Sequence, residues 1–342
     1  MPPIQENVSL LPFNTFKLDV SARYFTLIKT IADLRELIES PVYQSHQTLI
    51  LGGGSNMLFT GNFDGLVIKN EVKGIQTLEE NDANITLRVG SGENWHQFVM
   101  YCVDKNYGGL ENLSLIPGTV GAAPMQNIGA YGVEVKHVID EVEGIDLSSG
   151  KSVTFNNEAC QFGYRESIFK HEARNRYFIS SVTLTLTKKS HPFNVSYGAI
   201  KDTLVQFGVE QINLRTISDA VIHIRKSKLP DPVHIGNAGS FFKNPSVDIS
   251  VYEELKEKFP AIPGYKEQNN LVKVPAGWLI EQCGWKGKTI GQIGVHAQQA
   301  LVLVHYGGSE GKKIWELALQ IQASVKQKFG IILQPEVNVI SA

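Results

Sequence analysis

The sequence predicts a mixed α+β protein with more than one structural unit. The chain has 342 residues, and at roughly 150 residues per domain this length favours two or three domains. Apolar residues make up 42% and charged residues 19%, which is typical of globular proteins and excludes a disordered, collagenous or coiled-coil chain. Helical and strand-like patterns alternate along the chain, and helical patterns predominate beyond about residue 215. We therefore expect a boundary near that position.

Periodicity of the apolar residues places the elements before this boundary. Apolar residues that recur every three or four positions predict helices, and short or alternating apolar runs predict strands. The predicted elements are a helix over 30–39 that Pro41 ends, strands at 48–51, 66–68 and 85–89, a helix from 92 to about 104, and a β-rich stretch over 138–188 with a turn at 148–150 and a long strand at 176–187.

Helices dominate beyond residue 215. Thr216-Ile-Ser-Asp219 fits a capping box that begins a helix, and the two prolines of Leu229-Pro-Asp-Pro232 end it. Further predicted elements are helices over 251–259, 275–284 and 312–328, a strand over 300–304 and a last strand that begins Ile331-Ile-Leu333.

Charge and cysteine content exclude several classes of function. The formal net charge is −2, from 32 basic and 34 acidic residues, so bulk charge does not support binding to nucleic acid or a membrane surface. The longest strongly apolar run, 300–304, is far short of the roughly 18 to 20 residues of a membrane helix. A secretory signal has basic residues near its start, and here no Lys or Arg precedes Lys17. Cys102, Cys160 and Cys283 are odd in number and far apart, which predicts a reducing cytosol and no metal site.

Two clusters of small residues predict an anion site. Gly52-Gly-Gly-Ser-Asn56 follows a strand, and residues without Cβ let backbone N–H groups approach a phosphate. This loop is neither a Walker A motif nor a dinucleotide fingerprint, and alone it is equally well read as a tight turn. The stretch 116–132 holds four glycines and three alanines in seventeen residues, so recognition there must come mainly from backbone amides. Two such loops favour binding of a pyrophosphate and an apolar ring.

Three polar residues stand out as candidates for chemistry. Arg165, beside a tyrosine, could hold a carboxylate bidentately, although an isolated arginine more often forms a surface salt bridge. Ser240 could expose its hydroxyl in a tight turn while Phe241 and Phe242 anchor the core; the alternative is a helix-cap or turn serine. Serine-hydrolase chemistry is poorly supported, because no Gly-x-Ser-x-Gly elbow is present and no nearby His is implied. Glu336 is either a charge on an edge strand or a buried functional acid.

Taken in order, these motifs resemble those of the UDP-N-acetylenolpyruvoylglucosamine reductase family, also called MurB. The shared motifs are Gly52-Gly-Gly-Ser-Asn56, Ile116-Pro-Gly118 with Gln126-Asn-Ile-Gly-Ala-Tyr-Gly132, Gly163-Tyr-Arg165, Gly236-Asn-Ala-Gly-Ser-Phe-Phe-Lys-Asn-Pro245 and Pro335-Glu-Val337. They span nearly the whole chain, and Tyr197-Gly198 resembles the tyrosine loop of the longer, type I members.

The resemblance implies a fold and an activity. The fold would be α+β: an FAD-binding domain of the vanillyl-alcohol-oxidase (PCMH) type in two α/β subdomains, 1–65 with 331–342 and 66–215, and a separate α+β substrate-binding domain over 216–330. The activity would be that of a UDP-N-acetylmuramate dehydrogenase, a cytoplasmic oxidoreductase of peptidoglycan synthesis. It would reduce UDP-N-acetyl-3-O-(1-carboxyvinyl)glucosamine to UDP-N-acetylmuramate through non-covalent FAD, with NADPH as hydride donor. The resemblance implies no nucleic-acid partner, no membrane partner and no obligate protein partner.

The resemblance also implies roles for individual residues. Ser240 would donate a proton to C2 of the substrate after hydride reaches C3, helped by a neighbour such as Lys228 or by a water. Arg165 and Glu336 would assist at the substrate carboxylate, and Glu336 suits that place only if it is protonated or orients water or Arg165. The implied substrate contacts are Tyr164, Tyr197, Lys228 and Asn244. The implied cofactor contacts are Gly52, Gly53, Gly54, Ser55, Asn56, Pro117, Gly118, Gly121, Ala122, Asn127, Gly129, Ala130 and Tyr131.

Two other functions are consistent with parts of this pattern. One is a different FAD oxidoreductase of the same superfamily, such as a sugar or alcohol oxidase that uses oxygen. Many of those tether the flavin through His or Cys, and 51–59 contains neither, which favours a dissociable cofactor. The other is a non-catalytic nucleotide-sugar sensor, which would not need Ser240, Arg165 and Glu336 together.

Overall fold

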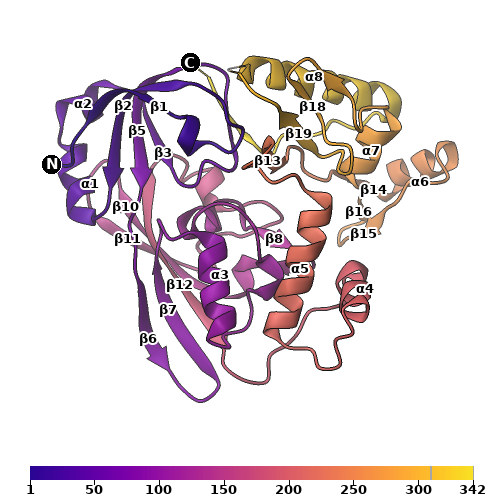
Figure 1. Ribbon diagram of the computed structural model, residues 1–342, viewed down its shortest axis with the longest axis horizontal. Helices are drawn as coiled ribbons and strands as arrows, with labels where there is room; N and C mark the ends of the chain where they lie inside the picture. The colour runs from indigo at the N-terminus through magenta and orange to yellow at the C-terminus, as the bar shows by residue number, and fades with distance from the viewer. Residues whose placement is uncertain (309, 342) are drawn as a thin grey trace. The chain divides into compact units, whose positions relative to one another are not determined.

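The chain folds into two units, each built from segments that are far apart in the sequence. The computed structural model describes residues 1–308 and 310–341 (Figure 1). The first unit comprises Met1–Val8, Ala22–Gly53 and Asp64–Ser227. The second comprises Ser9–Ser21, Gly54–Phe63 and the residues from Lys228 onward.

A four-stranded sheet in the order β1-β2-β5-β3 and a five-stranded sheet in the order β11-β10-β12-β7-β6 form the first unit. Its strands are β1 (Gln5–Ser9), β2 (Ser21–Ile28), β3 (Thr48–Leu51), β5 (Phe63–Asn70), β6 (Ile75–Glu80), β7 (Asn84–Gly90), β8 (Gly129–Ala130), β9 (Val133–Glu134), β10 (Ile139–Asp146), β11 (Ser152–Asn156) and β12 (Tyr177–Thr187). Its α-helices are α1 (Ile31–Ile38), α2 (Pro41–Ser45), α3 (Trp95–Asp104), α4 (Gly198–Gln206) and α5 (Leu214–Lys228), each counted with the unit that holds most of its residues. Short 3-10 helices are η2 (Glu111–Leu113), η3 (Val120–Ala122), η4 (Pro124–Gln126), η5 (Val135–His137) and η6 (Ile168–Lys170).

The five-stranded sheet is antiparallel, and α3 packs on one of its faces. The helix begins after Asn94, whose side chain accepts a hydrogen bond from the Gln97 amide (3.0 Å), as an N-cap residue does. Trp95, Phe98 and Cys102 are buried on its inner side, as the periodicity predicts. The resulting core supports the second glycine-rich stretch, because Val120 and Ala123 belong to the same cluster.

The four-stranded sheet positions the first glycine loop. Strands β3 and β5 pair in parallel, with Leu51 opposite Lys69, so the loop leaves the carboxyl end of β3. The predicted helix α1 begins with a capping box formed by Thr30 and Asp33. The prediction that Pro41 simply ends this helix is incomplete, because Ser40 caps a second short helix, α2, with the proline in its first turn.

Helix α5 starts earlier than predicted and belongs to the first unit. Asn213, not Thr216, is the capping residue, since the Thr216 amide donates to Asn213 Oδ1 (3.0 Å) and the Asn213 amide donates to Thr216 Oγ1 (3.0 Å). Figure 1 shows α5 beside α3, and Ser218 on α5 bonds Ser114 (2.8 Å). In the structure the first unit runs to Ser227 and the second resumes at Lys228, while the predicted domain limits stay a prediction.

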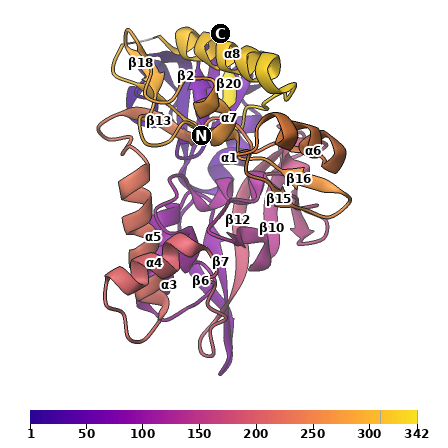
Figure 2. The same cartoon turned by 90° about the vertical axis from the view of Figure 1, so that its right-hand side faces the viewer.

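The second unit combines the C-terminal third of the chain with two short N-terminal segments. Its elements are β4 (Met57–Phe59), β13 (Gly236–Ser240), β14 (Ser246–Asp248), β15 (Tyr265–Lys266), β16 (Leu271–Lys273), β17 (Thr289–Ile290), β18 (Ile293–Val295), β19 (Val302–His305), β20 (Asn338–Ile340), η1 (Leu11–Phe13), α6 (Ile249–Lys258), α7 (Ala276–Gln282) and α8 (Gly311–Phe329). The sheets are β13-β19-β18-β17, β14-β16-β15 and the parallel pair β20-β4. Helix α8 packs on β18 and β19, and Figure 2 shows α6 beside β15 and β16.

The prediction of a strand beginning at Ile331 is wrong. Ile331 and Leu333 are buried and Ile332 is 60% exposed, so the alternation seen in the sequence is real. Residues 331–334 nevertheless belong to no strand; Pro335 forms a single antiparallel bridge with Phe242, and the ladder of β20 begins only at Asn338. Burial of alternate side chains against the unit explains the pattern without a β-ladder.

Candidate active site

In the first unit, the two glycine loops touch each other backbone to backbone. A Cβ added to Gly53 would lie 2.7 Å from Gly118 Cα, and one added to Gly52 would lie 2.8 Å from Thr119 Oγ1. Only glycine permits this approach, because a neighbouring backbone cannot rotate away. Gly53, Pro117 and Ala122 remain exposed, so the joined loops present a surface of main chain and small side chains.

Buried polar groups hold the second loop in place. The Gly121 amide donates to the Ser91 carbonyl (2.8 Å), and a Cβ on Gly121 would lie 2.5 Å from Ser91 Cβ. The Asn70 side chain in turn donates to Ser91 Oγ (2.8 Å) and to the Ile179 carbonyl (3.2 Å). The loop is therefore fixed to both sheets of the unit.

Arg165 lies at the tip of a tight turn that is tied to the glycine-rich stretch. Its φ is 56°, in the left-handed region, and the turn is closed by two hydrogen bonds between Gly163 and Glu166. Arg165 Nη2 donates to the Gly129 carbonyl (2.6 Å), and Asn127 Nδ2 donates to the Gly163 carbonyl (2.9 Å). Asn127 is fully buried and also accepts from an amide, so its carboxamide serves to hold this turn. The guanidinium additionally lies 5.4 Å from the centre of the Tyr164 ring.

A second arginine belongs to the same region. Arg225 on α5 donates from Nε to the Leu115 carbonyl (3.2 Å) and bonds the Tyr131 hydroxyl. Burial lowers the pKa of Arg225, and the charge of Arg165 lowers it further. Burial also raises the pKa of Tyr131. Burial lowers the pKa of His96, and the charge of Arg225 lowers it further. Arg225 is not among the residues predicted from the sequence, although its position four residues after the buried Val221 on one helix face is a signal for an inward-facing cation.

The predicted tyrosine loop lies against Tyr131. Tyr197 precedes α4 and is 52% exposed, and its ring centre is 5.4 Å from that of Tyr131 in an edge-to-face arrangement. The first unit therefore brings Arg165, Tyr131 and Tyr197 into one region with Arg225.

In the second unit, Ser240 ends strand β13 at an irregularity of the ladder. Pairing shifts between Asn237 and Ser240, and Gly239 takes a φ of 68° that favours glycine. Ser240 is exposed while Phe241 and Phe242 are 0% and 1% exposed, which is the arrangement that the sequence predicts. The Phe241 amide donates to the Leu301 carbonyl (2.8 Å), so the serine sits on a rigid aromatic anchor.

Glu336 lies on the segment that pairs with this anchor. Its amide donates to the Phe241 carbonyl (2.8 Å), and its own carbonyl accepts from Asn56 Nδ2 (3.1 Å). Glu336 is half-buried and stands outside any strand, which corrects its predicted place within a C-terminal strand. Ser240, Glu336 and Asn56 thus lie on adjacent segments of one unit.

Other predicted site residues of the second unit have separate surroundings. Gly54 is buried with a φ of 62°, and a Cβ there would lie 1.9 Å from the Phe13 carbonyl oxygen. Ser55 is half-buried beside it. Asn244 accepts from the Ala276 amide (2.9 Å) at the start of α7, and Lys228 is exposed.

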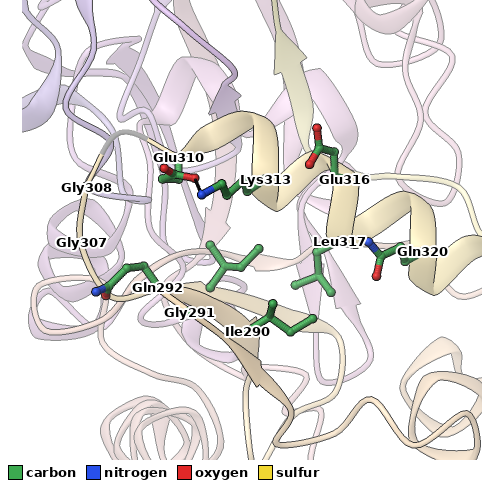
Figure 3. Close-up of a pocket in the computed structure, with 11 residues that line it drawn as sticks. Ile290, Gly291, Gln292, Gly307, Gly308, Glu310, Lys313, Glu316, Leu317 and Gln320 are labelled. Carbon is green, nitrogen blue, oxygen red and sulfur yellow. Dashed lines mark ion pairs between the residues drawn. The ribbon is translucent and has the colours of Figure 1, made fainter.

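A cavity of about 610 Å³ in the second unit contains none of these residues. It lies between the β17–β18 hairpin and α8, where Figure 3 shows Ile290 and Leu317 near each other and the ion pair of Glu310 with Lys313 at one end. Its lining has no predicted site residue, so we assign the cavity no part in the active site.

The geometry fits a flavin dinucleotide. Two exposed, side-chain-poor loops in contact can follow a pyrophosphate closely through main-chain groups. Half-buried arginines beside tyrosines suit an anionic ligand, and an exposed serine on a rigid support suits proton delivery. These features fit a flavin-dependent oxidoreductase.

Comparison with known proteins identifies the family. Residues 22–156 match the FAD binding domain model and residues 231–340 match the model of the UDP-N-acetylenolpyruvoylglucosamine reductase C-terminal domain. Relatives of that name from Amoebophilus asiaticus and Flavobacterium johnsoniae are 50% and 46% identical, over 98% of this chain and 99% of theirs. The crystal structure of the reductase from Thermus caldophilus has the same fold, with a TM-score of 0.67, 22% identity and 99% coverage of both chains. The chain belongs to the UDP-N-acetylenolpyruvoylglucosamine reductase family.

The comparisons confirm the predicted family, the α+β fold class with an FAD-binding domain, and the class of FAD-dependent reductase of peptidoglycan synthesis. Among residues 1–308 and 310–341, no helix is long and apolar enough to cross a membrane. The roles of individual site residues stay predictions.

Proposed function

We propose that the protein reduces the enolpyruvyl ether of UDP-N-acetyl-3-O-(1-carboxyvinyl)glucosamine to the lactyl ether of UDP-N-acetylmuramate, with NADPH as hydride source. The observation that carries this proposal is the 50% identity over 98% of the chain to a relative with the corresponding reductase name. FAD, when bound, supplies the hydride that adds to C3 of the substrate. Binding the substrate carboxylate and delivering a proton to C2 are then tasks for side chains.

Arg165 is proposed to bind the substrate carboxylate. Hydride addition at C3 places negative charge on C2 and the carboxylate, and a fixed cation stabilises charge where it develops. The guanidinium is held by the Gly129 carbonyl (2.6 Å), and Lys170 Nζ fixes the Arg165 carbonyl (3.0 Å), so little reorganisation is needed. Arg225 adds a second positive charge to this region, which favours an anionic ligand further.

Ser240 is proposed to donate the proton to C2. A neutral hydroxyl can act as a general acid when it is held within hydrogen-bond reach of the carbon that takes up the proton. Ser240 is exposed at the end of β13, and the buried rings on its C-terminal side restrict its movement. Glu336 is proposed to assist by orienting a water or a neighbouring group, as its half-buried position on the adjacent segment allows.

Rapid mixing of the two half-reactions tests these roles. Reduction of the flavin by NADPH needs no proton donor to C2, whereas reoxidation by the enolpyruvyl substrate does. Ser240→Ala should leave the first half-reaction near the wild-type rate and slow the second by roughly 10²- to 10⁴-fold. Ser240→Cys, which keeps a transferable proton, should recover part of the loss.

Ser246→Ala is the matched control, because Ser246 is also an exposed serine of the second unit, with Oγ bonded to Glu267 (2.5 Å). It should change neither half-reaction. If Ser240→Ala slows both halves equally, or neither, the proton comes from another group.

The same experiment separates the alternative functions. A flavin that NADPH bleaches and the enolpyruvyl substrate restores identifies the reductase. Reoxidation by oxygen with no effect of the substrate would indicate an oxidase, and binding of the nucleotide-sugar without any flavin chemistry would indicate a sensor.

A cytoplasmic location and a pair of small-molecule partners, the UDP-sugar and NADPH, follow from this proposal. Cys102, Cys160 and Cys283 are free thiols in the structure, as suits a reducing compartment. Fractionation of cells with an antibody to the protein tests the location.

A further inference from the structure

A buried carboxamide connects the two segments that carry Tyr131 and Tyr197. Asn112, on η2 of the first unit, is 1% exposed. Its Nδ2 donates to the carbonyls of Tyr131 (3.2 Å) and Asn194 (2.8 Å). Its Oδ1 is buried and has no partner among the residues that the structure describes. Because only the nitrogen of the carboxamide can donate, the two carbonyls fix the orientation of this side chain.

The two segments that Asn112 connects also contact each other directly. Asn194 Nδ2 donates to the Gly132 carbonyl (3.0 Å), and Val195 packs in the same apolar cluster as Tyr131. The contact ends in the edge-to-face pair of Tyr131 and Tyr197, with ring planes at 88°. Asn112 therefore lies at the base of an arrangement whose outer end is the exposed Tyr197 ring.

Both segments depend on tethers of this kind. Tyr131 has a φ of 49°, an unfavourable backbone conformation for a residue with a large side chain. Residues 188–197 lie between β12 and α4 and belong to no helix or strand. Without ladder or helix hydrogen bonds, the chain that leads to Tyr197 is held in part by the side-chain hydrogen bonds of Asn112 and Asn194.

We infer that Asn112 is a positioning residue that holds Tyr197 against Tyr131 before substrate binds. The inference rests on the proposed function, in which Tyr197 is a substrate contact. If the tether is lost, the Tyr197 segment is docked for only part of the time, and the apparent substrate affinity falls by that fraction. Asn112 touches none of the groups assigned to the chemistry, so its loss should act on KM and leave kcat unchanged.

A double-mutant cycle tests this inference. Asn112→Leu keeps the approximate size of the side chain and removes both hydrogen bonds. Two bonds of ordinary strength correspond to a rise in KM for the enolpyruvyl substrate of roughly five- to 150-fold. The variant Asn112→Leu/Tyr197→Ala should have the same KM as Tyr197→Ala alone, because Asn112 acts through Tyr197. In hydrogen exchange, the amides of 193–199 should exchange faster in Asn112→Leu, and those of β10 and β12 should not.

Asn157 provides a matched control. Its Nδ2 also bridges two carbonyls of the first unit, those of Lys136 (2.8 Å) and Ile139 (2.7 Å), but at an exposed position outside the tyrosine segments. Asn157→Leu should leave KM and the exchange of 193–199 unchanged. If Asn112→Leu does not fold, Asn112→Ser replaces it in the same cycle.

Three results would overturn the inference: equal losses in kcat and kcat/KM, an effect of Asn112→Leu that adds fully to that of Tyr197→Ala, or an unchanged KM with faster exchange. Failure of the proposed function is recognised separately, because the wild-type flavin would then not be reoxidised by the substrate at all.

Discussion

Replacing Gly53 with alanine tests whether the two glycine loops must touch for FAD to bind. The added Cβ would lie 2.7 Å from Gly118 Cα and 3.2 Å from Gly118 C. Carbon atoms pack comfortably at about 3.5–4.0 Å, so the loops would have to separate by about 1 Å. Both clashing atoms are main chain, which leaves no rotamer change as a means of relief.

The size of the effect follows from this clash. Forcing one extra atom into a packed site typically costs about 1–3 kcal/mol. If bound FAD requires the loops in contact, that free energy appears as a loss of FAD affinity of roughly five- to 150-fold. The larger Gly53→Leu should abolish FAD retention.

The assay is titration of flavin-free protein with FAD, followed by quenching of flavin fluorescence, together with thermal unfolding. Gly198→Ala is the control, because a Cβ at Gly198 meets no atom within 4 Å and the residue begins helix α4. It should bind FAD as the wild type does. A Gly53→Ala protein that retains stoichiometric FAD with wild-type affinity would refute a role for loop contact in binding the cofactor.

Four other predictions concern single side chains. Arg165→Lys keeps the charge but loses the planar fork, so turnover should fall strongly while FAD content stays normal; equal loss of both in steady-state assays would make Arg165 structural. Glu336→Gln should keep more activity than Glu336→Ala if the side chain acts through a hydrogen bond, and the order of the two kcat values decides this. Phe241→Ala removes a ring that is 0% exposed and should lower the free energy of unfolding by about 3–5 kcal/mol, measured by denaturant titration. The Ser148 hydroxyl, followed by Arg176, lowers the pKa of Asp146. The ionised Asp146 carboxylate therefore stabilises the fold above about pH 4, and this contribution is lost as the pH falls. In unfolding curves, Asp146→Asn should destabilise the protein at pH 7 and progressively less below pH 4.

Helices and strands with a clear apolar period could be predicted from the sequence. Helix α3 and strand β12 lie within a few residues of their predicted limits, because burial of one face sets both the pattern and the element. The exposed Ser240 between buried neighbours was predictable for the same reason, since two consecutive phenylalanines strongly favour the core. Features that depend on the apolar pattern of neighbouring residues could therefore be predicted from the sequence.

Elements that depend on tertiary context could not be predicted in this way. Alternation at Ile331 indicates burial but not pairing, because residues 331–333 lie in no strand and pairing begins only with the single bridge between Pro335 and Phe242. Helix α2 has no apolar period because it is only one turn long. Arg225 was missed because a cation next to Lys226 on a helix usually faces solvent, and only the fold shows that Leu115 and Tyr131 receive its side chain.

The backbone of the first unit explains why so much of its candidate site consists of polar tethers. Four non-glycine residues near this site have φ values in the left-handed region: Leu115 (59°), Asn127 (45°), Tyr131 (49°) and Arg165 (56°). Such conformations typically cost about 1–3 kcal/mol each and persist only when the surroundings fix them. Each is fixed by side chains: Arg225 holds the Leu115 carbonyl, Asn112 that of Tyr131 and Lys170 that of Arg165, while Asn127 is held by its own carboxamide. The strained turns bring Arg165 and Tyr131 to the site, and the tethers keep them there. A site built in this way is ordered before its ligand arrives, as the role proposed for Arg165 beside a developing negative charge requires.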